Sequence, residues 1–102
     1  MRKSILQPQW PYDGRIPPDA RCLLCGAPAE CRHHVYPGNP NRRISEENGF
    51  WAYLCNRCHN GSPRSVHMDA SLSDDLKRAC QVRYEQGHTR EQFRALVGRS
   101  WL

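Results

Sequence analysis

The sequence has little of what a large hydrophobic core or a membrane anchor requires. Only 38% of its 102 residues are hydrophobic, and it contains two phenylalanines and two methionines. No segment reaches the roughly 20 apolar residues of a membrane-spanning helix, and residues 1–12 lack the apolar stretch of a secretory signal. We therefore expect no membrane partner and a cytoplasmic location. A core this small needs further stabilisation, from disulfides, a metal or a partner.

Cysteine, in contrast, is abundant, and four of the six cysteines form two Cys-x-x-Cys pairs. The pairs are Cys22 with Cys25 and Cys55 with Cys58. Each pair can offer two thiolates from one tight loop, and zinc prefers four such ligands in a tetrahedron. A redox-active pair usually occurs once, and a cytoplasmic location disfavours disulfides. The spacing therefore predicts one structural zinc that also supplies folding free energy.

Turn residues and hydropathy patterns divide one α+β domain into three parts. Four prolines make residues 1–21 an irregular arm, which packs only where its apolar side chains find a surface. Residues 22–70 form the zinc-bound core, with strands expected near 32–36 and 50–54, a long polar loop over 37–49, and a short helix or turn after the second cysteine pair. Residues 71–102 are expected to form two helices that pack on this core.

Apolar periodicity and capping residues define these two helices. Ser71 is expected to cap the first, which ends near Gly87, and Thr89 with Gln92 forms a capping-box pair for the second. The apolar face of the first helix is Leu72, Leu76, Ala79, Cys80 and Tyr84, and that of the second is Phe93, Leu96, Val97 and Trp101. Cys80 is thus expected in the core, and Cys31 is either a buried thiol or a spare ligand.

Four of the five histidines cluster around the predicted zinc unit. His33 and His34 lie between the cysteine pairs, His59 follows the second pair directly, and His67 lies eight residues further on. His88 falls in the turn between the helices and is expected to be a surface residue. Imidazole changes charge near neutral pH and also binds transition metals, so the cluster is a candidate for proton transfer, metal binding or both.

The strings HHVYPGNPNRR and LCNRCHNGSPRSVH, over residues 33–43 and 54–67, resemble small HNH nucleases of phages and prophages. The resemblance covers residues 22–69 closely and the terminal helices more loosely. It implies a zinc-stabilised ββα-metal fold with two additional C-terminal helices. It also implies metal-dependent hydrolysis of phosphodiester bonds in DNA, by an enzyme located in the cytoplasm of a bacterial host or encoded by a phage.

The resemblance also implies a role for each histidine of the motif. His33 and His59 correspond to ligands of a second divalent metal, which is Mg, Mn, Ni or Zn, and His67 is our candidate for a third ligand. His34 corresponds to the general base that takes a proton from water. Neutral imidazoles favour Zn, Ni or Mn over Mg, which prefers carboxylates.

Two further features of the loop between the strands bear on this assignment. Arg42 and Arg43 are candidates to hold the DNA backbone. The middle residue of the family motif is an asparagine, but this sequence has Phe50 at that place, five positions before the second cysteine pair. Asn48 and Asn60 are the asparagines we consider for that role, which is to orient the loop that carries the base.

The net charge of +5 favours a polyanionic partner with or without catalysis. A non-catalytic zinc module that binds nucleic acid is one alternative, with Trp51 and Tyr53 stacking on bases. A protein-interaction module is another. Histidines that converge on one point favour the enzyme, whereas histidines that point apart favour a binding module.

Overall fold

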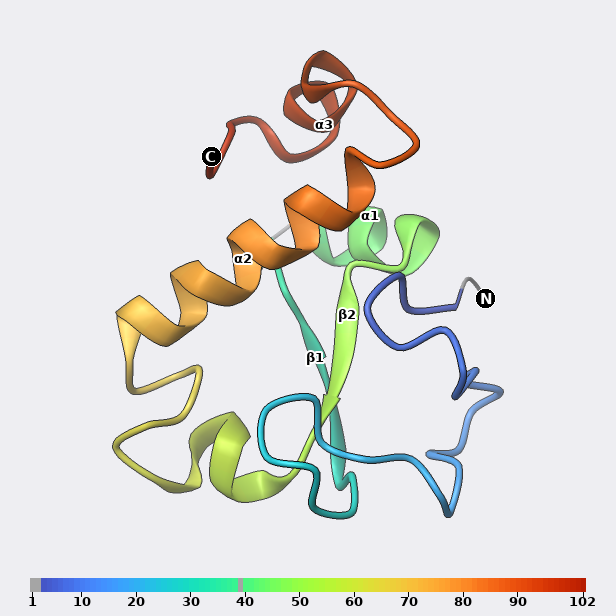
Figure 1. Cartoon of the computed structure of the whole chain (residues 1–102), viewed down its shortest axis with the longest axis vertical. Coiled ribbons are helices and arrows are strands. Elements are labelled where there is room, and N and C mark those ends of the chain that lie inside the picture. Colours follow the sequence, from blue (N-terminus) through green and yellow to red (C-terminus); the bar gives the residue numbers. More distant parts are fainter. Residues whose placement is uncertain (1–2, 39) are drawn as a thin grey trace.

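Two short antiparallel strands form the centre of the structure, a computed structural model that describes residues 3–38 and 40–102 (Figure 1). β1 (Cys31–His34) pairs with β2 (Trp51–Leu54), so that His33 lies opposite Ala52. All four residues of β2 are buried, as its apolar and aromatic composition predicts. Together with the helices, this sheet confirms the predicted α+β class.

The prediction of a loop over residues 37–49 is wrong for the second half of that segment, which forms helix α1 (Asn41–Asn48). The prolines and the glycine of residues 37–40 indicate a loop, although the eight residues that follow them are compatible with a helix. Gly49 ends the helix with a φ of 74°, and its N–H donates to the carbonyl of Ser45. A Cβ at Gly49 would also collide with the carbonyl oxygen of Lys3, so the position requires glycine.

After β2 the chain enters a short π-helical turn, η1 (Arg57–Gly61), where a helix or turn was expected. Helices α2 (Ala70–Tyr84) and α3 (Arg90–Val97) follow. In the described part of the chain no helix is long and apolar enough to cross a membrane. Figure 1 shows α2 crossing one end of the sheet with α3 beyond it, while the cysteine loops occupy the other end.

The sequence predicted the capping residue of α3 but not that of α2. Asp69, not Ser71, caps α2, because its carboxylate accepts a hydrogen bond from the N–H of Leu72 at 3.2 Å. The capping box of Thr89 and Gln92 on α3 is confirmed. A carboxylate one residue before the first turn also benefits from the helix dipole, which favours aspartate at this position.

One hydrophobic core joins the sheet to α2 and α3. Tyr36, Phe50, Tyr84 and Phe93 contact one another edge-on, with ring centroids 5.3–5.4 Å apart for the pairs Tyr36–Phe50, Tyr36–Phe93 and Phe50–Tyr84. The predicted apolar faces contribute to this core, except for one residue. Ala79 is exposed, because it lies on the side of α2 that faces away from the sheet.

The N-terminal arm covers the opposite face of the sheet. Trp10, Tyr12 and Ile16 pack against Trp51 and Tyr53, both of which are fully buried. Side-chain hydrogen bonds fix the arm where regular structure is absent: Ser4 donates to the carbonyl of Trp51, and Gln7 accepts from the N–H of Tyr53. Trp51 and Tyr53 are therefore core residues, and their rings are not available to stack on bases.

Candidate metal centres

Two clusters of metal-ligating side chains lie beside the sheet. The first consists of Cys22, Cys25, Cys55 and Cys58, whose Sγ atoms all lie within 4.8 Å of one another. The Sγ atoms of Cys25 and Cys55 are 3.6 Å apart, and tetrahedral zinc with Zn–S bonds of about 2.3 Å separates its sulfurs by about 3.8 Å. The four thiols thus fit a metal ion such as zinc.

The backbone of the first cysteine loop prepares the thiol of Cys22 for this role. The N–H of Cys22 donates to the carbonyl of Ala27 at 2.7 Å, and Gly26 closes the turn with a φ of 78°. Burial of Cys22 opposes its ionisation, but the nearby backbone N–H groups outweigh this effect and lower the pKa of the thiol to about 7. A thiolate, the form that binds metal, is therefore accessible near neutral pH.

The other two cysteines stand apart from this cluster. Cys31 is half-buried and its thiol donates to the carbonyl of Leu54 at 3.3 Å. Burial raises the pKa of Cys31, and it also raises the pKa of Cys80 to about 12. Cys80 lies in the hydrophobic core, as predicted. The sequence left two alternatives for Cys31, a buried thiol or a spare ligand. The structure has it as a half-buried thiol outside the ligand set.

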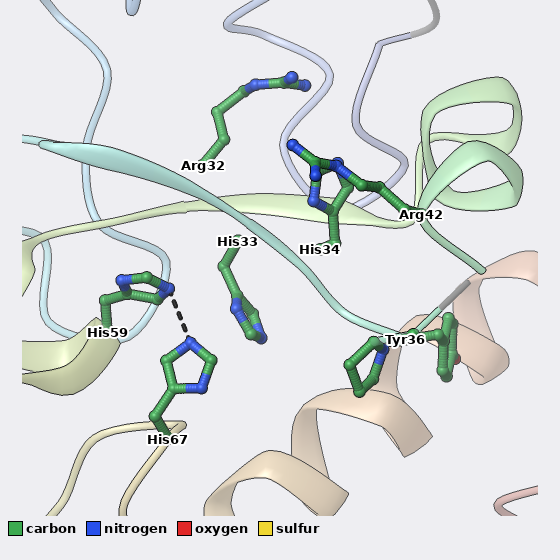
Figure 2. A pocket seen from close by; sticks show the side chains of 9 residues that line it. Arg32, His33, His34, Tyr36, Arg42, His59 and His67 are labelled. Atoms are coloured by element: carbon green, nitrogen blue, oxygen red, sulfur yellow. Dashed lines mark hydrogen bonds between the residues drawn. The ribbon is translucent and has the colours of Figure 1, made fainter. Parts of the chain in front are cut away.

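The second cluster brings together three histidines from three separate segments (Figure 2). His33 lies on β1, His59 on η1 and His67 on the loop before α2, and each offers a ring nitrogen within 4.8 Å of the other two. The Nε2 atoms of His59 and His67 are 2.9 Å apart. This distance is a few tenths of an ångström below the roughly 3.3 Å between nitrogens on tetrahedral zinc, so a small ring rotation suffices.

Backbone hydrogen bonds explain how the loop presents His67 to His59. The N–H of Val66 donates to the carbonyl of Cys58 at 2.9 Å, and the N–H of His67 donates to the carbonyl of His59 at 3.2 Å. The turn that carries Cys58 thus also carries His59 and is bonded to the loop that carries His67. Anything that anchors Cys58 also positions His59 and His67.

The surroundings keep two histidines of this cluster, His33 and His59, uncharged at neutral pH. His33 is only 8% exposed, and burial, reinforced by His59 and His67, lowers its pKa to about 4. Burial also lowers the pKa of His59, followed by the effect of His67. His33 and His59 are therefore neutral at pH 7, which leaves a lone pair on each ring for a metal ion.

A cavity of about 530 Å³ borders the histidine cluster. Side chains from both faces of β1 line the cavity. The structure describes every residue of β2, and none of them lines it. The cavity therefore lies along the edge of β1 that points away from β2. The lining residues are Arg32, His33, His34, Tyr36, Pro37, Gly38, Arg42, His59 and His67. The cluster, His34 and two arginines thus share one space.

His34 makes a contact that the sequence did not indicate. Its Nε2 lies 2.7 Å from Oε1 of Glu46 on α1, and Arg32 forms a two-pronged ion pair with the same carboxylate. Burial opposes ionisation of Glu46, but the hydrogen bonds from Arg32 and His34 outweigh it and lower the pKa of this carboxyl. Because Glu46 fell in the segment predicted as loop, no periodicity pointed to it.

The other candidate residues divide between the cavity and the surface. Arg42 lines the cavity, whereas Arg43 is exposed and pairs with Glu47 at 3.5 Å on the outside of α1. Asn48 donates to the carbonyl of Ile44 in its own helix, and Asn60 is exposed on η1. The hydrogen-bond partner of His34 is instead Glu46, whose carboxylate accepts.

The fold and these clusters define a small α+β protein that carries ligands for a metal ion such as zinc. Comparisons with protein-family models, with curated proteins and with solved structures find no match to this chain.

Proposed function

We propose that the chain is a metal-dependent DNA endonuclease of the HNH type, with β1, β2 and the η1 segment as its ββα-metal unit. The observation that supports this most strongly is the convergence of His33, His59 and His67 beside a cavity that also contains His34. A binding module has no need for three imidazoles at ligand distance from one another. A hydrolase that uses a metal ion does.

The two clusters receive different roles in this proposal. The four cysteines hold a structural zinc, since their ligand set is complete. The three histidines hold a second divalent cation, which when bound supplies positive charge to offset the charge that develops on the scissile phosphate. Three protein ligands leave a coordination position free on the side of the cavity.

Side chains of the cavity supply the other two roles, proton transfer and phosphate binding. His34 accepts a proton from the attacking water, which requires one ring nitrogen with a free lone pair. Arg42, which lines the cavity, binds and orients the phosphate backbone. Among the described residues, no Asp or Glu lines the cavity, and the net charge of the chain is +5. Both features favour a polyanionic substrate.

The non-catalytic alternatives, a nucleic-acid-binding or protein-interaction module, are weaker on one specific point. The aromatic residues proposed to stack on bases, Trp51 and Tyr53, are fully buried under the N-terminal arm. Binding without catalysis would then rest on arginines alone. It would also leave the histidine cluster without a purpose.

A plasmid-nicking assay tests the proposal. Wild type, His34→Ala and His88→Ala are compared with Mg, Mn, Ni, Zn or no added metal. His88 is an exposed histidine outside the cavity and serves as the matched control. We expect metal-dependent cleavage that His34→Ala reduces about 10²- to 10⁴-fold and His88→Ala leaves intact. A folded, metal-loaded wild type that cuts nothing would favour the binding module.

A further inference from the structure

The carboxylate of Glu46 is bonded both to His34, the proposed base, and to Arg32. We propose that Glu46 is a positioning residue for His34: it holds the imidazole in the tautomer that carries its proton on Nε2, so that Nδ1 is the nitrogen that accepts a proton. This inference rests on the proposed function, in which His34 is the base. Nothing in the sequence resemblance assigns a role to Glu46.

The tautomer follows from the chemistry of the contact. Oε1 of Glu46 lies 2.7 Å from Nε2 of His34 and 2.7 Å from Nη2 of Arg32. An ionised carboxylate has only lone pairs to offer, so both nitrogens must donate to it. Nε2 of His34 therefore carries the proton, and Nδ1 of the neutral ring keeps its lone pair.

Arg32 holds the carboxylate in place. Its Nη1 donates to Oε2 of Glu46 at 3.3 Å, so the guanidinium grips both oxygens. The guanidinium carbon itself lies 3.8 Å from the ring centre of Tyr12 and 4.7 Å from that of Trp51. With the arginine held against two aromatic rings and its side chain only 14% exposed, Glu46 has little freedom to turn away from His34.

Strand geometry explains why these residues meet. Arg32 and His34 are two residues apart on β1 and therefore project to the same face, while His33 projects to the other face with the metal-ligating cluster. Glu46, on α1, reaches the face of β1 that carries Arg32 and His34, because α1 packs against β1. The ligand and the base are thus supported by different neighbours, although they are adjacent in sequence.

This arrangement takes over the function that a motif asparagine would have. Asn48 is bonded within α1, and Phe50 is part of the hydrophobic core. A carboxylate bonded directly to the imidazole controls both its orientation and its tautomer, and loss of such a partner typically reduces activity about 10- to 100-fold.

Nuclear magnetic resonance of the zinc-loaded, histidine-¹⁵N-labelled protein tests the tautomer directly. Spectra are recorded at about pH 8, above the ordinary pKa of imidazole, for wild type, Glu46→Ala, Glu46→Gln and Glu47→Gln. His34→Ala assigns the His34 signals. We expect the Nε2–H tautomer in wild type and in Glu47→Gln, its loss or mixing in Glu46→Ala, and retention in Glu46→Gln, whose amide oxygen can still accept from Nε2.

Cleavage rates of the same variants give the second readout. Glu46→Ala should lower kcat about 10- to 100-fold with little change in KM, and Glu46→Gln should restore much of the loss. Glu47→Gln, on the same helix but exposed and paired only with Arg43, should behave as wild type. A folded Glu46→Ala protein with an unchanged His34 tautomer, or with wild-type kcat, would overturn the positioning role.

The two proposals fail in different ways. If wild type cuts DNA and Glu46→Ala cuts it equally well, the endonuclease stands and the positioning role does not. If wild type cuts no DNA, the general-base role of His34 falls together with the endonuclease, even where the spectra show that Glu46 sets the tautomer.

Discussion

The two ligand clusters share one turn of the chain but differ in completeness and surroundings. The four thiols form a full tetrahedral set at the end of the sheet, with Cys22 and Cys55 buried. The three imidazoles are one ligand short of such a set and border a cavity of about 530 Å³. A complete set leaves no room for a substrate, whereas an incomplete set beside a cavity does.

We expect the dependence between the two proposed metal sites to be one-sided. Cys58 and His59 are adjacent on η1, and the loop that carries His67 is bonded to the carbonyls of both. Loss of a metal from the thiols should therefore remove the anchor of the turn that presents His59 and His67. Loss of a metal from the imidazoles should leave the thiols and the hydrophobic core intact. The following predictions test this asymmetry.

Removal of a cysteine ligand should have the largest effect. In Cys58→Ser the thiol set is incomplete, and a structural zinc contributes on the order of 10 kcal/mol to a small domain. We expect the variant to lose zinc, its cooperative thermal transition and all cleavage. Zinc analysis and near-ultraviolet circular dichroism, which reports on buried tryptophan, measure this.

Cys31→Ser is the matched control, because Cys31 bonds to Leu54 and lies outside the thiol set. It should keep its zinc and its transition. A Cys58→Ser protein that melts like wild type would show that the core alone supports the fold.

Loss of a histidine ligand should abolish function without unfolding the chain. His59 is half-buried and contributes no aliphatic packing to the core, so His59→Ala should retain the thiol-bound zinc and a melting temperature close to that of wild type. It should lose the second metal and metal-dependent cleavage. Metal content per chain and titration calorimetry check this, and an unfolded His59→Ala protein would contradict the one-sided dependence.

The sequence indicated the residues of both ligand clusters but not the contact between His34 and Glu46, for a physical reason. Cys-x-x-Cys spacing is fixed by coordination within one tight loop, so the thiol set could be read locally. The contact between Glu46 and His34 depends instead on how α1 docks on β1, which no local pattern encodes. The helix itself was hidden because Pro37, Gly38 and Pro40 precede it, although Gly49 marks its end.

The two arginines proposed to contact DNA should separate clearly. Arg42 lines the cavity, whereas Arg43 pairs with Glu47 on the outer surface. A hydrogen bond from arginine to a charged group is worth about 1.5–3 kcal/mol, so Arg42→Ala should lower kcat/KM roughly 10- to 100-fold. Arg43→Ala should change it only a few-fold. Equal losses in the two variants would mean that DNA runs over the outer face of α1 and not into the cavity.

The smallest effect should come from the Tyr12 ring of the N-terminal arm, which contacts the Arg32 guanidinium on the cavity side. In Tyr12→Leu the apolar contact with Trp51 persists while the ring under the Arg32 guanidinium is lost, and such a cation–π contact is worth about 0.5–2 kcal/mol. Because Arg32 holds Glu46, we expect cleavage to fall a few-fold with zinc content unchanged. Tyr12→Phe keeps the ring and should match wild type in kinetic assays. If Tyr12→Phe and Tyr12→Leu were equally impaired, the hydroxyl and not the ring would be the part of Tyr12 that matters, and the arm would act on the cavity by a route other than Arg32.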